Sequence, residues 1–317
     1  MVLTHLRPRL AGDVVRSLLD VEGLPPERVI VVVNGEGGLD DAALEGRVRM
    51  VRLPRNTGPA GGFRAGLALA FEDPGIRWAY LCEDDVGLIE LPAPRVAELV
   101  ERIEGLTADR ARVGAVVAYG SRFVGRGSHT VNTVPPGSGS GFIPVDVAAW
   151  GATLVSRDVV DAGVLPDPDW FFGLEDFDFF CRVREAGFEV LVDADTARAV
   201  AHSQTGGGRT DAFRAHRPTD RDEAWRAYYH TRNSVALGRR HGRPSWHLWY
   251  LLYTARQLQR ASSSDHRMAI VHGAWDGARG RMGEHPRYAR RVGEFGPATD
   301  GDGAPSTPEP LHGRDRA

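Results

Sequence analysis

Short apolar runs alternate with amphipathic stretches along the first third of the chain, and each apolar run ends in a polar or glycine-rich segment. This alternation is typical of βαβ units that build a mostly parallel sheet. Apolar positions at helical spacing predict helices around residues 14–19 and 67–71. The predicted strands are residues 29–33, 48–53 and 78–82. The pattern therefore predicts an α/β fold with a mostly parallel sheet flanked by helices.

The rest of the chain divides into three parts. Residues 113–193 continue the strand and helix pattern, with a Gly/Ser/Pro-rich stretch at residues 125–141 that we expect to be a mobile loop. From residue 222 the pattern becomes helical, whereas the last residues are rich in Pro, Gly and Asp and predict disorder. We therefore expect an α/β domain at residues 1–221, a C-terminal helical extension at 222–296 and a disordered tail at 297–317.

Composition narrows the class of protein. Among 317 residues, 42% are hydrophobic and 26% are charged, which is typical of a folded globular chain. The net charge of -3 gives no reason to expect a nucleic-acid partner. Cys82 and Cys181 lie in apolar runs, which favours a reducing compartment over a disulfide framework. With no apolar stretch approaching the roughly 20 residues that span a bilayer, we expect a cytoplasmic protein.

Three carboxylates follow the predicted strand at residues 78–82. In an open parallel sheet, ligands bind beyond the carboxyl ends of the strands. Glu83, Asp84 and Asp85 are therefore candidate site residues, as are Asn34 and the loop that begins at Arg55. Adjacent carboxylates repel one another, and their oxygens suit Mg²⁺ or Mn²⁺ shared with phosphate oxygens. The alternative is a solvated acidic turn.

The segment RNTGPAGGFRAGL begins at Arg55 and leads into a predicted helix. It includes Asn56, and its residues Gly58, Gly61 and Gly62 permit close approach of the backbone to an anion. The alternative is a tight turn with close helix packing. The segment lacks the spacing of a dinucleotide-binding motif and the lysine of a P-loop.

A second pair of carboxylates, Glu175 and Asp176, begins the helix predicted at residues 175–187. A carboxylate on a rigid helix start can remove a proton from an attacking hydroxyl as a general base. Acidic residues are also common in a first turn because they interact well with the helix dipole. His202 follows a strand-like run, and an imidazole there can complete a cation site or serve a structural role.

Taken together, these motifs resemble family-2 glycosyltransferases of the GT-A fold, especially bacterial rhamnosyl- and galactofuranosyltransferase-like members. The resemblance covers roughly residues 2–283 and has the family's order of motifs. Glu83 opens a carboxylate cluster that is usually richer in Asp. The segments that carry the resemblance are VIVVVNG, RNTGPAGGFRAG, LCEDDV and WFFGLEDFDFFCRVREAG followed by AHSQTGG.

The resemblance implies an inverting transfer of a rhamnose- or galactofuranose-like sugar from a UDP- or dTDP-linked donor to a hydroxyl of a glycan or lipid-linked acceptor. Glu175 and Asp176 match the family's base motif, with Asp176 as the base. The EDD segment matches its metal motif, which makes Asp84, Asp85 and His202 ligands of Mn²⁺ or Mg²⁺. The implied nucleotide-sugar contacts are Thr4, Arg7, Asn34, Arg55, Asn56, Gly58, Gly61, Gly62, Glu83 and Asp84.

Two other functions are compatible with the motifs. A sugar-phosphate nucleotidyltransferase uses a similar sheet and metal, although VLTHLRPRLAGD lacks the glycine-rich, basic signature usual at its first strand. A non-catalytic nucleotide-sugar-binding module would not need the carboxylates. The sequence leaves the sugar, the acceptor and the oligomeric state open.

The C-terminal helical pattern supports two hypotheses. Its aromatic residues and arginines suit peripheral contact with the inner face of the cell membrane. The alternative is that part of this segment packs on the α/β domain, because its apolar residues are too many for one face. These apolar residues are Trp246, Trp249, Tyr250, Leu251, Leu252 and Tyr253, and the flanking cations are Arg239, Arg240, Arg243, Arg256 and Arg260.

Overall fold

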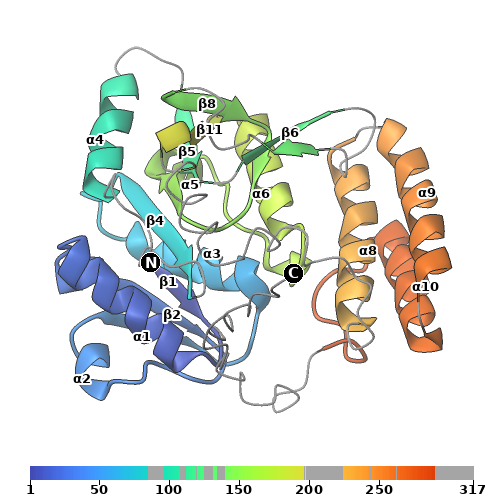
Figure 1. Cartoon of the computed structure of the whole chain (residues 1–317), viewed down its shortest axis with the longest axis horizontal. Helices are drawn as coiled ribbons and strands as arrows, with labels where there is room; N and C mark the ends of the chain where they lie inside the picture. Colours follow the sequence, from blue (N-terminus) through green and yellow to red (C-terminus); the bar gives the residue numbers. More distant parts are fainter. Residues whose placement is uncertain are drawn as a thin grey trace, which may run out of the picture.

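The computed structural model shows an α/β body with a group of C-terminal helices at one end (Figure 1). The predicted tail, most of the predicted loop at 125–141 and the boundary predicted at residues 221 and 222 lie outside the described residues. The structure describes residues 1–84, 96–107, 112–118, 120–124, 131–133, 140–195, 197, 224–242, 244–261 and 263–289.

A mixed eight-stranded sheet forms the centre of the body, in the order β3-β2-β1-β4-β10-β5-β11-β8. Strands β3, β2, β1 and β4 are parallel, β10 is antiparallel to β4 and β5, and β11 is parallel to β5. The carboxyl ends of β1, β2 and β4 therefore share one edge. The strands are β1 (Val2–Thr4), β2 (Ile30–Asn34), β3 (Arg49–Leu53), β4 (Trp78–Glu83), β5 (Val113–Val117), β8 (Phe142–Val145), β10 (Thr153–Ser156) and β11 (Glu189–Asp193).

A small second sheet has the order β7-β6-β9. Its strands are β6 (Gly120–Phe123), β7 (Val131–Thr133) and β9 (Val147–Ala148). The strand-like run at residues 145–156 is thus divided between sheets: β9 joins the small sheet, and β10 joins the central one. The chain turns between them at Ala152, which has a positive φ of 49°.

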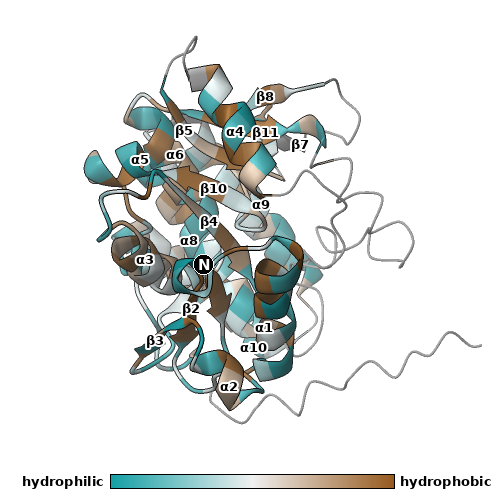
Figure 2. Cartoon of the chain, turned by 90° about the vertical axis from the view of Figure 1, so that its left-hand side faces the viewer, coloured by the Kyte–Doolittle hydropathy of each residue, from teal (hydrophilic) through white to brown (hydrophobic). Residues whose placement is uncertain are grey.

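Helices cover both faces of the central sheet (Figure 2), and strands β2 and β5 are buried along their whole length. Alternate residues of a strand point to opposite faces. Ile30 and Val32 pack in the core beneath α3, α5 and α6, whereas Val31 and Val33 pack in the core beneath α1 and α4. The helices of the body are α1 (Pro8–Arg16), α2 (Ala42–Glu45), α3 (Gly58–Ala70), α4 (Val96–Thr107), α5 (Arg157–Asp161) and α6 (Glu175–Glu185).

The C-terminal helices are α8 (Ala224–Arg240), α9 (Pro244–Arg260) and α10 (Ser264–Arg279). Helix α10 packs closely on α8 because Gly273 and Gly277 face it: an added Cβ on either would lie 2.4 Å from a backbone oxygen of α8. Helix α9 buries Trp246 and Tyr250 against Trp170 of the α/β body. No helix in the described part of the chain is long and apolar enough to cross a membrane.

The fold prediction is confirmed: the protein is α/β, with a mostly parallel sheet flanked by helices and a C-terminal helical extension. The prediction that part of the C-terminal segment packs on the α/β domain is also correct. Trp246 is 2% exposed and Tyr250 is 3% exposed, so neither belongs to an outer apolar surface.

Candidate functional site

The ends of β1 and β4 bring three predicted residues together. The hydroxyl of Thr4 donates to Oδ2 of Asp84 at 2.7 Å, and a guanidinium nitrogen of Arg7 lies 3.1 Å from Oδ1. The backbone N–H of Asp84 donates to the carbonyl of Leu3 at 3.1 Å, which extends the pairing of the two strands. Asp84 is therefore a buried carboxylate of fixed orientation at the sheet edge where ligands bind in α/β proteins.

Asn34, at the end of β2, fastens the loop that precedes α3. Its Nδ2 donates to Oδ1 of Asn56 at 3.1 Å and to the carbonyl of Gly58 at 2.9 Å. Its Oδ1 accepts from the backbone N–H of Thr57 at 2.8 Å and from the Thr57 hydroxyl at 2.9 Å. Asn56 in turn accepts from the N–H of Gly58 at 2.9 Å. Both the nitrogen and the oxygen of the Asn34 amide form hydrogen bonds with this loop, so Asn34 fixes the position of the loop.

The predicted glycines of this loop and of α3 have packing partners. An added Cβ on Gly61 would lie 2.3 Å from the side chain of Thr57, and one on Gly62 would lie 2.3 Å from Leu3. Gly58 has a φ of 72°, and an added Cβ would lie 1.7 Å from the carbonyl oxygen of Phe171. The alternative interpretation of close packing thus accounts for all three glycines. Gly58 also places the start of α3 against the segment that leads into α6.

We expect Gly58→Ala to lower the free energy of unfolding by about 2–5 kcal/mol, because a left-handed backbone and a backbone clash both oppose the methyl group. Gly163→Ala is the matched control: Gly163 also has a positive φ, of 80°, but nothing lies within 4 Å of an added Cβ. Gly163→Ala should lower the free energy of unfolding by about 1–2 kcal/mol. Urea unfolding of both variants measures the difference, and equal losses would show that the Phe171 contact is unimportant.

Glu175 and Asp176 begin α6, as predicted, and they differ in exposure. Glu175 is buried at 6% exposure, whereas Asp176 is only partly buried. Oδ1 of Asp176 accepts from the backbone N–H of Phe177 at 2.8 Å, which fixes the direction of the carboxylate. Asp176 is thus the member of the pair that a bound molecule can reach.

Burial controls the protonation of this pair. Removal from water raises the pKa of Asp176 to about 7, and the backbone N–H of Phe177 opposes the rise. Burial raises the pKa of Glu175 well above its usual range, and the charges of Asp176 and Glu83 raise it further. The charge of Glu83, at the end of β4, thus acts on Glu175 at the start of α6. A carboxyl group with a pKa near 7 is suited to general acid–base chemistry at neutral pH.

Trp150 lies beside Glu175, and the sequence did not single it out. Its ring packs on Phe63, Phe179 and Phe180, with centroid distances of 4.7, 5.2 and 5.7 Å. Its indole N–H partly offsets the rise in the pKa of Glu175, although neither that N–H nor Oε2 of Glu175 has a well-aligned hydrogen bond within the described residues. Trp150 supplies the apolar surroundings that keep Glu175 out of water.

Strained backbone surrounds the site. In the described part of the chain, the non-glycine residues with a positive φ are Leu6 (59°), Ala152 (49°), Phe171 (48°) and Leu174 (62°). Leu6 follows β1 beside Arg7, Ala152 follows Trp150, and Leu174 directly precedes Glu175. Such conformations cost about 1–3 kcal/mol each and are concentrated at functional sites. The strain therefore supports a functional role for this edge of the sheet.

Three predicted site residues lie away from this cluster or cannot be placed. The side chain of Arg55 is 74% exposed and pairs with Glu284 at 3.3 Å. Asp85 and His202 lie outside the described residues. Their assignments as metal ligands stay predictions.

The described residues contain no group of three side chains that could hold a metal ion. Asp84 offers hard oxygen ligands at the end of β4, directly after Glu83. Carboxylate oxygens are the ligands that Mg²⁺ and Mn²⁺ prefer. With Asp85 and His202 as further ligands, the set would suit a divalent cation.

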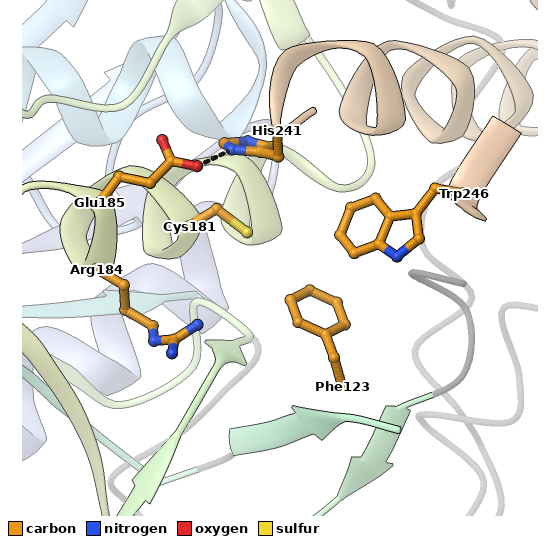
Figure 3. A pocket seen from close by; sticks show the side chains of 6 residues that line it. All are labelled: Phe123, Cys181, Arg184, Glu185, His241 and Trp246. Carbon is orange, nitrogen blue, oxygen red and sulfur yellow. Dashed lines mark hydrogen bonds and ion pairs between the residues drawn. The ribbon is translucent and has the colours of Figure 1, made fainter. Parts of the chain in front are cut away.

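A cavity of about 250 Å³ lies away from this cluster (Figure 3). It lies beside the C-terminal half of α6, whereas Glu175 and Asp176 begin that helix. Arg184 and His241 at this cavity already form ion pairs, with Asp146 and Glu185 respectively. Its lining is Phe123, Cys181, Arg184, Glu185, His241 and Trp246. None of the predicted site residues lines it.

Comparison with known proteins gives structural likenesses only. No protein-family model and no curated sequence matches the chain. It is similar to the crystal structure of GalNAc-T7 with UDP, GalNAc and Mn²⁺, with a TM-score of 0.46 and 12% identity over 81% of this chain and 56% of that one. The chain therefore spans just over half the length of that structure. It is also similar to A197 from STIV, with a TM-score of 0.31 and 16% identity over 51% of this chain and 78% of that one.

Proposed function

We propose that the chain is an inverting glycosyltransferase of the GT-A type that moves a sugar from a nucleotide-diphosphate donor to an acceptor hydroxyl. The observation that supports this best is Asp176, a partly buried carboxyl group at the start of α6 whose direction is fixed by the backbone N–H of Phe177. Thr4, Arg7 and Asp84 are joined at the carboxyl ends of β1 and β4, and Glu83 of β4 raises the pKa of Glu175, the neighbour of Asp176. The strand order, with antiparallel β10 between β4 and β5, is compatible with the GT-A arrangement.

The proposed reaction needs a base for the acceptor hydroxyl and positive charge near the diphosphate. The acceptor oxygen forms a bond to the anomeric carbon while the bond from that carbon to the diphosphate oxygen breaks, which inverts the configuration. Oδ1 of Asp176 is held by the N–H of Phe177, so Oδ2 takes the hydroxyl proton. The bonding electrons leave with the nucleoside diphosphate. Arg7, beside Asp84, supplies positive charge that can stabilise the negative charge developing on the diphosphate.

A divalent cation bound by Asp84, Asp85 and His202 would offset the charge that develops on the diphosphate. Thr4 and Arg7 keep the carboxylate of Asp84 oriented before the donor arrives. From the family resemblance we propose that the donor is a UDP- or dTDP-linked, rhamnose- or galactofuranose-like sugar. The proposed acceptor is a glycan or a lipid-linked molecule of the cell envelope. These remain parts of the proposal.

The proposal is tested by incubating the full chain with a panel of UDP- and dTDP-sugars, with Mn²⁺, with Mg²⁺ and with EDTA. We expect one donor to raise the melting temperature in the presence of a metal, because it binds only the folded state. The same donor should slowly release nucleoside diphosphate, with water as the acceptor. Stabilisation without release at any pH would indicate a non-catalytic binding module. Nucleotide-sugar formation from a nucleoside triphosphate and a sugar phosphate would indicate a nucleotidyltransferase.

We further propose that the protein is cytoplasmic and contacts the inner face of the cell membrane through the outer face of α9 and α10. Helices α9 and α10 contact each other in the C-terminal group (Figure 1). Arg256 and Arg260 are exposed on α9, and Arg267 and Arg279 on α10. The apolar residues of the outer face are Leu248, Trp249, Leu251, Leu252, Met268, Val271 and Trp275, which are 41–70% exposed. Exposed apolar residues with nearby cations are typical of binding to anionic lipid.

We expect the full chain to co-sediment with vesicles of phosphatidylcholine and phosphatidylglycerol at low salt, and less at high salt. L251E/L252E should abolish the binding, whereas A42E/A43E, which adds the same charge to exposed positions of α2, should not. Failure of the wild-type chain to bind at low salt would contradict the proposal. A change from dimer to monomer in L251E/L252E would instead identify a second copy as the partner of this face.

A further inference from the structure

Two adjacent polar residues of α8, Arg232 and Asn233, are completely buried. A buried guanidinium and a buried amide are costly unless each polar group has a partner. Both side chains reach across to the α/β body, to a segment of the chain about 60 residues earlier. The segment they hold, Trp170 to Leu174, leads directly into α6 and its carboxylates.

Asn233 holds this segment through three backbone carbonyls. The two hydrogens of its Nδ2 are shared among the carbonyls of Trp170 at 2.9 Å, Phe172 at 2.9 Å and Gly173 at 2.5 Å. Its Oδ1 accepts from Nε of Arg232 at 2.8 Å. Because a guanidinium can only donate, this bond requires the amide oxygen to face Arg232 and the amide nitrogen to face the carbonyls. Arg232 therefore sets the orientation of the Asn233 amide.

Arg232 is itself held on several sides. It donates to the carbonyl of Trp170 at 3.1 Å and to the carbonyl of Gly283 beyond α10, and its guanidinium lies 4.8 Å from the ring centre of Tyr229. Planar guanidinium groups stack well on aromatic faces. The orientation of Asn233 thus depends on contacts within α8 and with the segment that follows α10.

The segment that Asn233 holds needs external support. Phe171 and Leu174 have positive φ angles of 48° and 62°, and Gly58 abuts the carbonyl of Phe171. Such a backbone persists only where its surroundings enforce it. The carbonyl of Leu174 then accepts from the N–H of Asp178 at 3.0 Å, which starts the hydrogen bonding of α6. The path of this segment therefore fixes where Glu175 and Asp176 lie.

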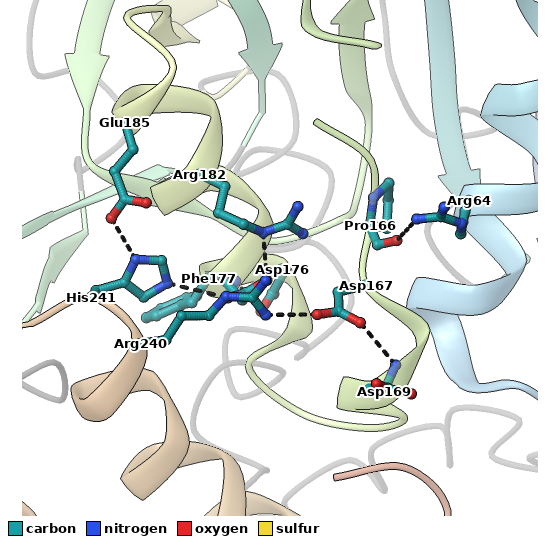
Figure 4. A network of polar contacts seen from close by, with 11 residues as sticks. Arg64, Pro166, Asp167, Asp169, Asp176, Phe177, Arg182, Glu185, Arg240 and His241 are labelled. Carbon is teal, nitrogen blue, oxygen red and sulfur yellow. Dashed lines mark hydrogen bonds and ion pairs between the residues drawn. The ribbon is translucent and has the colours of Figure 1, made fainter. Parts of the chain in front are cut away.

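The end of α8 contacts the same region a second time (Figure 4). Arg240 pairs with Asp167 at 2.6 Å, ahead of the segment, and lies 3.4 Å from the fully buried Asp178 in α6. Nε2 of His241 also lies 3.2 Å from Asp178. Helix α8 therefore contacts the chain on both sides of the carboxylate pair.

We propose that Asn233, oriented by Arg232, is a positioning residue for the carboxylate pair at the start of α6, so that the C-terminal helices complete the catalytic site. The expected effect on kcat rests on the proposed function. Helix α8 would affect turnover by positioning the carboxylates, without itself contacting the acceptor or a membrane.

The test is Asn233→Asp in the full chain, which keeps the side-chain shape but replaces the donating nitrogen with an oxygen that repels the carbonyls. We expect kcat for donor hydrolysis to fall by about tenfold or more while KM for the donor changes less than about twofold. We also expect the rising limb of the pH–rate profile to move to lower pH, because a loosened segment admits water to Asp176. Wild-type kcat and pH profile in the folded variant would overturn the proposal.

Ser234→Ala is the matched control. Ser234 is also buried in α8, but the partner of its hydroxyl among the described residues is the carbonyl of His230 in the same helix, at 2.7 Å. This variant should keep the wild-type pH profile. If Asn233→Asp does not fold, Asn233→Ser retains one donor and should show the same kinetic changes to a smaller extent. An Asn233→Ser variant with wild-type kinetics would then overturn the proposal.

Amide hydrogen exchange separates this inference from the proposed function. In the ligand-free protein, loss of the Asn233 donors should speed exchange of the amides at residues 171–178, whatever reaction the protein catalyses. If no sugar donor is turned over but this exchange increases specifically, the proposed function fails and the positioning role stands. If the wild-type chain turns over a donor but the Asn233 variant shows unchanged amide exchange, the positioning role is wrong and the proposed function stands.

Discussion

Asp176→Asn should lower turnover by about a hundredfold or more and leave the affinity for the donor nearly unchanged. An asparagine keeps the shape of the side chain and can still accept from the N–H of Phe177, but it cannot take a proton from the acceptor hydroxyl. Loss of a general base typically costs a factor of about 10²–10⁴. Steady-state kinetics give the loss of turnover, and isothermal titration of the donor gives the affinity.

Asp169→Asn provides a matched control, because Asp169 is an exposed carboxylate just before the same segment. It should retain wild-type turnover. Wild-type turnover in Asp176→Asn would show that Asp176 only begins the helix, and Glu175→Gln would then be the next variant. Glu175 is the weaker candidate, because its buried carboxyl group has its pKa raised well above the usual range and lies out of reach of solvent.

The raised pKa of Asp176 gives activity and stability opposite dependences on pH. A general base acts when deprotonated, so activity should rise as the pH increases through about 7. In the folded state Asp176 keeps its proton up to about pH 7, whereas an unfolded aspartate releases it near pH 4. The contribution of this group to the free energy of unfolding therefore falls as the pH rises between these values. At pH 8, Asp176→Asn should therefore melt a few degrees higher than the wild type.

The fold follows from local patterns that the sequence displays directly. Runs such as VIVVV are apolar on both faces, which requires helices above and below a strand, and the structure places Ile30 and Val32 in one core and Val31 and Val33 in the other. The start of α6 at Glu175 was also evident, from the carboxylates that precede an apolar stripe. Such features depend on neighbours in the chain, so the sequence alone suffices to predict them.

The contacts that shape the site depend on residues far apart in the chain. The ligand contact of Asn34 stays a prediction, whereas its contacts with Asn56, Thr57 and Gly58 arise because the register of β2 places it beside that loop. Nothing in the spacing of α8 showed that Asn233 faces the carbonyls before α6. The available signal was a pair of polar residues, Arg232 and Asn233, on the inner side of an otherwise amphipathic helix.

The glycines before and within α3 show that one pattern can have two explanations. Their spacing suggested an anion-binding turn, whereas an added Cβ on Gly62 would meet Leu3 and one on Gly58 would meet the backbone of Phe171. A glycine is needed equally where a ligand approaches the backbone and where another part of the protein does. Only the fold distinguishes the two cases, because the second partner comes from elsewhere in the chain.

Asp85→Ala should remove the part of donor binding that depends on Mn²⁺, and Asp84→Asn should weaken it. We expect a loss of at least about a hundredfold in metal-dependent affinity for Asp85→Ala, or about 2.7 kcal/mol. Asp84→Asn keeps an oxygen to accept from Thr4, so the strand ends stay joined while one negative charge is lost. Isothermal titration of the donor with Mn²⁺ and with EDTA measures both effects.

Arg7→Ala distinguishes the metal from the protein's own cation at this edge. Arg7 is partly exposed and pairs with Asp84, so it can contribute positive charge to the diphosphate without a metal. Its loss should weaken donor binding by a similar factor with Mn²⁺ and with EDTA, whereas the carboxylate variants should lose affinity only with Mn²⁺. If Asp85→Ala and Asp84→Asn both keep wild-type metal-dependent affinity, these carboxylates do not hold the cation, and the charge of Arg7 becomes the main attraction for the diphosphate.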